Sequence, residues 1–257
     1  MTETLLSIGH GFTAREFGAY VQNHGWRVIG TTRSEAKAQQ LSDIGVEPIV
    51  WPGHDLGDAI KQATHILVSA SPDANGDAFF NAYHSQLAAS DSLKWIGYLS
   101  TTGVYGDHGG AWVDETTPVV PSTKRGQHRV KAEHQWLQSG LPVHVFRLAG
   151  IYGAGRGPFE KLRNGTARLV KKESGYLLWK ALGQVVSPCL RSCIVENGRT
   201  RRCDALGGSR RPGSRGRGTG RQRRHVHGLG APSPLGRVRC RQQQGRRLCG
   251  HYVWLRR

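Results

Sequence analysis

Six short apolar segments alternate with segments of helical character along the first 150 residues, and this alternation limits the fold more than any other feature. The apolar segments cover residues 5–8, 27–31, 48–51, 65–70, 94–100 and 143–148. The helical segments between them cover residues 12–21, 34–41, 58–62, 77–89 and 124–138. Strands that alternate with helices build a parallel sheet with helices on both faces. The sequence therefore predicts a doubly wound α/β fold.

A glycine-rich turn joins the first apolar segment to the first helical one. Residues 9–14 read GHGFTA, which matches the pattern G-x-G-x-x-G/A after a strand and at the start of a helix. Gly9 allows the tight turn, Gly11 lets a pyrophosphate approach the backbone, and the small Ala14 allows close helix–strand packing. The helix start also offers free amides and a partial positive charge. The turn favours a dinucleotide-binding sheet of the Rossmann type; a strand-to-helix turn without a ligand is the alternative.

The loops that follow the predicted strands hold the other candidate contacts. Ligands of such sheets bind beyond the carboxyl ends of the strands, where the strand order reverses. The predicted cofactor contacts are Gly9, Gly11, Phe12 and Ala14 in the glycine loop, and Ser69 and Ala70 after the fourth strand.

The end of the second apolar segment indicates which dinucleotide binds. An acidic residue here, roughly 20 residues after the glycines, would bind the ribose 2′-hydroxyl of NAD. Residues 30–34 read GTTRS and hold no carboxylate. Arg33 offers a partner for a 2′-phosphate, and the hydroxyls of Thr31, Thr32 and Ser34 add hydrogen bonds. The sequence therefore favours NADP over NAD; an Arg33 that meets only solvent is the alternative.

Two further segments resemble a known family. Residues 98–121 read YLSTTGVYGDHGGAWVDETTPVVP, and residues 147–162 read RLAGIYGAGRGPFEKL. A strand that ends in Ser and Thr, followed by VYG and an acidic stretch before a proline, resembles the extended short-chain dehydrogenase/reductases. Within them it is similar to the NAD-dependent epimerase/dehydratase-like proteins, over about residues 3–170. The resemblance implies an NAD(P)-binding oxidoreductase or epimerase that transfers hydride on a carbonyl or alcohol, for example in a nucleotide-sugar-like substrate.

The catalytic residues that the resemblance implies are only partly present. In the family, a Ser or Thr at the end of that strand holds the substrate oxygen, and this role falls to Thr101. A Tyr-x-x-x-Lys pair follows, in which the tyrosine moves a proton and the lysine holds the nicotinamide ribose. Arg125 and Arg129 stand at these positions, and an arginine stays protonated, so it cannot shuttle a proton. Arg129 keeps a predicted contact to the ribose or a phosphate, and the chain resembles the atypical branch of the superfamily.

Four other side chains near these motifs can exchange a proton, namely Tyr105, His128, Asp114 and Glu115. None of them is assigned the role, because VYG normally shapes the pocket, neighbouring helix positions face different ways, and loop carboxylates are commonly solvated. Two hypotheses follow. One is a reductase or epimerase-like enzyme in which Thr101 polarises the substrate oxygen. The other is a non-catalytic NAD(P)-binding sensor or scaffold, or a truncated inactive homologue.

The composition changes after residue 170. Residues 1–170 hold 15 basic and 15 acidic side chains, so the whole formal net charge of +18 lies in residues 171–257. Low hydrophobicity with high net charge predicts a largely disordered tail, which divides the chain into a Rossmann domain at 1–170 and a tail at 171–257. An Arg/Gly-rich segment that binds nucleic acid is one interpretation. An out-of-frame C-terminus is favoured, because 18 arginines and no lysine follow Lys180.

All five cysteines lie in this tail, at Cys189, Cys193, Cys203, Cys240 and Cys249. Their spacing lacks the close pairs of a zinc site, so no metal is predicted. The N-terminus shows no basic and apolar leader, and no apolar run reaches the ~20 residues of a membrane helix. We therefore expect a cytoplasmic protein whose partners are a nicotinamide dinucleotide and a small molecule.

Overall fold

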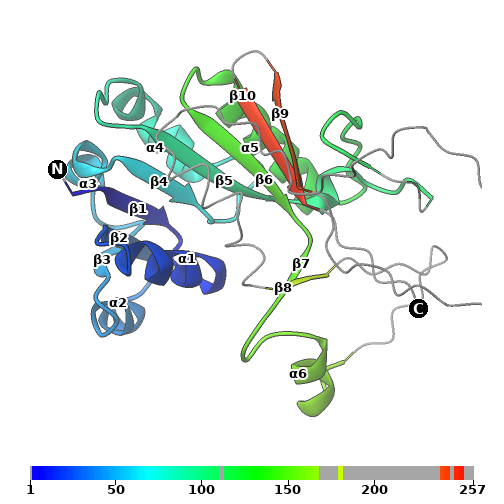
Figure 1. Ribbon diagram of the computed structural model, residues 1–257, viewed down its shortest axis with the longest axis horizontal. Helices are drawn as coiled ribbons and strands as arrows, with labels where there is room; N and C mark the ends of the chain where they lie inside the picture. Colours follow the sequence, from blue (N-terminus) through cyan, green and yellow to red (C-terminus); the bar gives the residue numbers. More distant parts are fainter. Residues whose placement is uncertain are drawn as a thin grey trace, which may run out of the picture.

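A single parallel sheet dominates the computed structural model, which describes residues 2–109, 111 and 113–167 and the backbone of strands at 179–181, 238–243 and 246–251. The strand order is β3-β2-β1-β4-β5-β6-β10-β9 (Figure 1). The pairs from β3 to β6 are all parallel, which confirms the doubly wound prediction. These strands are β1 (Thr4–Ile8), β2 (Arg27–Thr32), β3 (Glu47–Val50), β4 (His65–Val68), β5 (Trp95–Thr101) and β6 (Val143–Leu148).

Five helices cover the two faces of this sheet. Helices α1 (Phe12–Gln22) and α2 (Glu35–Ser42) pack on one face. Helices α3 (Gly57–Gln62), α4 (Ala78–Ala88) and α5 (Lys124–Gln138) pack on the other. The strand order reverses between β1 and β4, so the crevice beyond the carboxyl ends of these two strands is the expected ligand site.

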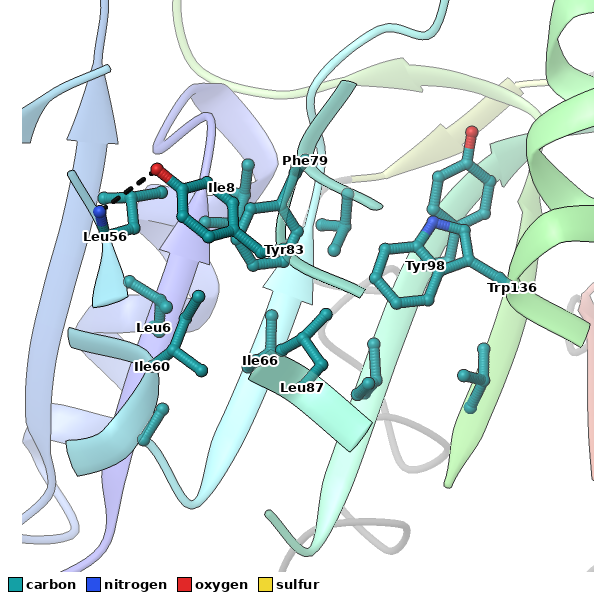
Figure 2. Packing of buried hydrophobic residues seen from close by; sticks show 14 of the residues in the cluster. Leu6, Ile8, Leu56, Ile60, Ile66, Phe79, Tyr83, Leu87, Tyr98 and Trp136 are labelled. Carbon is teal, nitrogen blue, oxygen red and sulfur yellow. Dashed lines mark hydrogen bonds between the residues drawn. The ribbon is translucent and has the colours of Figure 1, made fainter. Parts of the chain in front are cut away.

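The buried side chains form two hydrophobic clusters, one on each face, because successive strand residues point to opposite sides. Leu5 of β1 enters the cluster below α1 and α2, and its neighbour Leu6 enters the cluster below α3, α4 and α5. Figure 2 shows the second cluster, with Trp136 of α5 and Tyr83 of α4 over the strands. The Tyr83 hydroxyl accepts a hydrogen bond from the amide of Leu56 at 3.2 Å.

The remaining elements follow β5 and β6. A short 3₁₀ turn, η1 (Thr102–Val104), continues β5, while β7 (Gly150–Tyr152) and α6 (Pro158–Arg163) follow β6. Strand β7 pairs with β8 (Trp179–Ala181) in a separate small sheet.

Strands β9 (Val238–Gln243) and β10 (Arg246–His251) lie within the segment for which the sequence predicts disorder. β10 pairs in parallel with β6, and β9 pairs antiparallel with β10. The side-chain pattern did not reveal them, because strands pair through backbone groups, and an open sheet edge offers such groups to any extended segment. Apart from β8, the rest of the tail, with Cys189, Cys193 and Cys203, lies outside the described residues. The nucleic-acid-binding and out-of-frame interpretations concern this part of the chain and stay untested predictions.

Candidate functional site

The glycine loop is tied to both neighbouring strands. Gly9 has a φ of +76°, and a Cβ at this position would lie 3.1 Å from the amide nitrogen of Ala70. The amide of Gly9 donates to Oγ1 of Thr31 at 2.7 Å, and the amide of His10 donates to the Thr31 carbonyl at 2.8 Å. From the other side, the Ser69 hydroxyl donates to the carbonyl of Gly9. Only glycine fits this turn, and Thr31 and Ser69 hold it in place.

Helix α1 begins directly after the turn, with an open first turn. Gly11 is the N-cap and offers no side-chain hydrogen bond to the helix. The amides of Phe12, Thr13 and Ala14 have no acceptor within a helix that starts here. Among the described residues, a Cβ on Gly11 would meet only the carbonyl oxygen of Gly9, at 3.8 Å, so this part of the structure leaves the space in front of Gly11 open. An uncapped helix start that faces open space favours an anion such as a pyrophosphate.

Three adjoining clefts run along this edge of the sheet. The loop cleft, of about 280 Å³, lies between the glycine loop and the ends of β5 and β6. The β2 cleft, of about 390 Å³, lies between the glycine loop and the end of β2. The α5 cleft, of about 470 Å³, lies at the start of α5. Gly9, Gly11 and Ser69 line the first two, and Thr101 and Arg129 line the first and third, so the clefts adjoin one another.

The β2 cleft carries the predicted cations. Thr32 and Arg33 line it, together with Lys37 from the first turns of α2, which the sequence analysis did not single out. Neither the Arg33 nor the Lys37 side chain has a hydrogen-bond or ion-pair partner among the described residues. Asp77 lines the same cleft, but it is 2% exposed and accepts the amide of Phe80 at 2.9 Å as the N-cap of α4. Burial raises the pKa of Asp77, and the Phe80 amide opposes this.

Thr101 lies at the end of β5, where it lines both the loop cleft and the α5 cleft. Its Oγ1 accepts the amide of Gly103 at 3.2 Å, because Thr101 is the N-cap of η1. A hydroxyl that accepts one hydrogen bond still has its own proton to donate. Thr101 is thus able to donate to an oxygen atom bound in either cleft.

Helix α5 places two arginines on the α5 cleft, Arg125 and Arg129. Nη1 of Arg129 donates to the Tyr98 hydroxyl at 3.1 Å and to the Leu99 carbonyl at 2.6 Å. Burial raises the pKa of Tyr98, while the positive charge of Arg129 lowers it. Arg125 is exposed and has no hydrogen-bond or ion-pair partner within the described part of the chain.

A buried ion pair fixes α5 against β5 and β6. Arg147 of β6 donates to Glu133 of α5, with Nη2 2.7 Å from Oε2, and Ser100 of β5 donates to Oε1 of Glu133 at 2.5 Å. Nη1 of Arg147 also donates to the Tyr105 hydroxyl at 3.1 Å. Glu133 is 1% exposed and Arg147 is 8% exposed. Glu133 lies one turn after Arg129 on the same helix, so this pair also sets the position of Arg129 over the clefts.

The other candidates for proton transfer lie elsewhere. Tyr105 is 2% exposed, its hydroxyl is bonded to Arg147, and it lines none of the three clefts. Asp114 accepts hydrogen bonds from Thr116 and Thr117 within its own turn, which lowers its pKa. His128 and Glu115 are also absent from the cleft linings.

His10, inside the glycine motif, is a buried residue that the sequence analysis did not anticipate. It is 6% exposed, and a Cβ on Gly18 or Gly30 would come within 2.8 or 2.9 Å of its side chain. Neither ring nitrogen has a hydrogen-bond partner among the described residues. Burial, assisted by the charge of Arg15, lowers the pKa of His10 to about 4. A neutral imidazole therefore fills the space that two glycines leave below the loop.

Arg156 is a second residue that the sequence analysis missed. It lines the loop cleft, and its guanidinium lies 4.9 Å from the centre of the Phe12 ring at the start of α1. A backbone pair between Gly153 and Arg156 holds the turn that carries it. The glycine-rich stretch GAGRG after the sixth strand was the available signal, because loops after strands carry the ligand contacts in such sheets.

The predicted cofactor residues differ in how they meet the clefts. Gly9, Gly11, Phe12, Ser69 and Arg129 line the loop cleft. Ala70, Thr32 and Arg33 line the β2 cleft. The side chain of Ala14 is fully buried in the core and lines none of the three clefts, so any contact of Ala14 with a ligand is limited to its backbone.

Within the described residues, no group of three or more His, Cys, Asp or Glu side chains is placed to hold a metal ion. None of the described helices has both the length and the apolar character of a membrane span.

Comparison with known proteins places the chain among related sequences. No family model matches it. Protein YeeZ of Escherichia coli (strain K12) is 32% identical over 166 residues, which cover 59% of this chain and 60% of that protein. The chain therefore spans about three fifths of the length of this relative.

Solved structures give the same fold. A functionally unknown conserved protein from Silicibacter pomeroyi DSS is 46% identical, with a TM-score of 0.69, over 75% of this chain and 68% of that chain. UDP-glucuronic acid 4-epimerase from Bacillus cereus, solved in complex with NAD, matches with a TM-score of 0.56 at 16% identity, over 71% of each chain. At this identity the second likeness concerns the fold alone.

Proposed function

We propose that the chain, which belongs to the same family as the conserved Silicibacter pomeroyi protein, binds a nicotinamide dinucleotide. It has the fold of the NAD-dependent epimerases and dehydratases among the extended short-chain dehydrogenase/reductases. NADP is the preferred form. The proposed reaction is hydride transfer to or from a carbonyl or alcohol carbon.

The observation that carries the proposal is the space in front of Gly11. This residue lines both the loop cleft and the β2 cleft, at the uncapped start of α1, and among the described residues a Cβ there would approach only the carbonyl oxygen of Gly9, at 3.8 Å. Nothing in the fold itself requires glycine at this position, whereas a pyrophosphate on the helix start does. The β2 cleft would hold the adenosine half, and the loop cleft would hold the nicotinamide half.

The preference for NADP rests on charge. Arg33 and Lys37 line the β2 cleft without partners among the described residues, and Ser34 makes no capping hydrogen bond at the start of α2. These groups are suited to the 2′-phosphate of NADP, since charge-assisted hydrogen bonds to phosphate are about twice as strong as neutral ones.

Titration of the full-length protein with NADPH and with NADH, monitored by nucleotide fluorescence, tests both the binding of a dinucleotide and the preference for NADP. We expect Arg33→Gln to weaken NADPH binding about tenfold, as for the loss of one hydrogen bond between charged groups, and to leave NADH binding unchanged. Lys124→Gln removes one positive charge outside the β2 cleft and serves as the control. Equal losses for both nucleotides in Arg33→Gln would contradict the assignment of Arg33 to the 2′-phosphate.

The chemistry in the loop cleft follows from its lining. A bound nicotinamide would donate or accept the hydride. Thr101 donates a hydrogen bond to the substrate oxygen, which polarises a carbonyl carbon toward hydride. Leu99, Leu148 and Ile151 line the same cleft and limit the access of water to the reacting carbon.

A second candidate function is dinucleotide binding without turnover, as in a sensor or scaffold. The specific observation in its favour is Arg125, which stands where the family resemblance places the proton-transferring tyrosine. Incubation of the full-length protein with NADPH and a panel of aldehydes and nucleotide sugars separates the two. NADPH oxidation that Thr101→Ala removes supports the enzyme, and saturable NADPH binding without oxidation supports the sensor.

A further inference from the structure

The α5 cleft is a cationic pocket that adjoins the loop cleft and shares Thr101 and Arg129 with it. Its described lining comprises Ser71, Pro72, Thr101, Gly103, Thr123, Arg125, Gly126 and Arg129. This lining holds two arginines and no acidic residue. At about 470 Å³ the cleft has the size of a small-molecule site. We infer that the α5 cleft binds a small molecule through an oxyanion, a carboxylate or a phosphate, held by Arg125 and Arg129.

Both arginines retain N–H donors that have no partner among the described residues. Arg129 uses only Nη1 for Tyr98 and Leu99, so its Nε and Nη2 have no hydrogen-bond partner among the described residues. Arg125 has no such partner for any of its nitrogens in the described part of the chain. A guanidinium with free N–H groups fits the planar geometry of a carboxylate and the oxygens of a phosphate.

Arg129 is held in place by the protein itself, before any ligand binds. Two hydrogen bonds to β5 fix one end of its guanidinium, and the ring of Tyr98 lies 5.6 Å from its centre. The ion pair between Glu133 and Arg147 fixes the helix one turn further on. A binding group that is already ordered loses less side-chain entropy when it binds.

The position of Thr101 extends the inference to a substrate class. Thr101 lines the α5 cleft beside both arginines and also lines the loop cleft. A ligand whose oxyanion lies on the arginines can therefore bring a carbonyl or hydroxyl group to Thr101. The substrate class is a carbonyl or alcohol compound that carries a carboxylate or phosphate, and this part rests on the proposed hydride transfer.

Calorimetric titration of the full-length protein, without dinucleotide, tests the oxyanion site. The probes are inorganic phosphate and malonate, which represent the two oxyanion types. The variant is Arg125→Gln, which breaks no hydrogen bond or ion pair with another described residue, and the control is Lys124→Gln, which removes a charge from the same helix outside the cleft. A parallel titration of Gly11→Ala reports phosphate that binds at the glycine loop instead.

We expect Arg125→Gln to weaken the binding of phosphate or malonate about tenfold and Lys124→Gln to leave it unchanged. Phosphate binding that Gly11→Ala weakens and Arg125→Gln does not is binding at the glycine loop, and it would contradict the inference. The probe that binds more tightly then identifies the oxyanion as carboxylate or phosphate. Equal affinity in the wild type and Arg125→Gln, or no saturable binding of either probe, would overturn the inference. Because no dinucleotide is present, failure of NADPH binding and failure of this site are distinguishable results.

Discussion

Replacement of His10 by an uncharged side chain of similar size is expected to make the fold less sensitive to acid. The imidazole is 6% exposed and both of its nitrogens lack partners among the described residues, so protonation inside the fold costs free energy. Burial lowers the pKa of His10 from 6.5 to about 4. In the unfolded chain, the same histidine takes up a proton near pH 6.5.

The sign and the size of the effect follow from this difference. Above pH 6.5 His10 is neutral in both states and the stability is complete. As the pH falls toward about 4, the unfolded state binds a proton that the folded state rejects, so the free energy of unfolding decreases. At 1.36 kcal/mol for each pH unit, the full loss is about 3 kcal/mol.

Urea unfolding followed by circular dichroism measures this loss, at neutral pH and at about pH 4.5. His10→Met and His10→Gln differ in packing but neither titrates, so both are expected to lose about 2 to 3 kcal/mol less than the wild type between the two conditions. Some acid sensitivity remains in both variants, because burial also lowers the pKa of His65 to about 4. If both variants lose as much stability as the wild type, the assignment of a neutral, buried His10 is wrong.

Two further predictions concern stability. Gly9→Ala is expected to lower the free energy of unfolding by about 1–2 kcal/mol or more, because a left-handed backbone is strained in alanine and the new Cβ would press on Ala70; Gly11→Ala is the matched control, and equal unfolding curves for the two variants would contradict the account of the loop. Glu133→Gln leaves Arg147 buried without its carboxylate and is expected to cost about 3–5 kcal/mol in urea unfolding. A loss below about 1 kcal/mol in that variant would mean that the ion pair does not hold α5.

The sequence predicts the helices and strands of this fold well, because the pattern that indicates each one lies within its own residues. Alternating apolar and helical segments gave the six parallel strands, and the predicted helix at 124–138 coincides with α5. One predicted strand ran two residues too far: 65–70 was expected, and β4 ends at Val68. Ser69 and Ala70 lie in the loop after β4, where they line the clefts, as their assignment to cofactor contacts requires.

The parts that sequence reasoning missed depend on contacts between distant segments. Glu133 sits in a helix rich in polar residues, and nothing near it in sequence indicates that it is buried against Arg147 of β6. The glycine motif predicted the loop, because the need for glycine there comes from local backbone geometry. Arg33 and Arg129 were also predicted beside it. Lys37 lies in no motif and Arg156 only in the glycine-rich stretch GAGRG, and the three-dimensional fold brings both to the clefts beside the loop.

The most direct test of the central claim is NADPH titration of the full-length wild type and of Gly11→Ala, with thermal unfolding measured in parallel. Within the part of the chain that the structure describes, a Cβ on Gly11 meets only the carbonyl oxygen of Gly9, at 3.8 Å, so the variant is expected to unfold at the same temperature as the wild type. Its methyl group enters the space assigned to the pyrophosphate, so NADPH affinity is expected to fall at least about tenfold. Saturable binding that is equal in both proteins, or none in the wild type, would contradict the account.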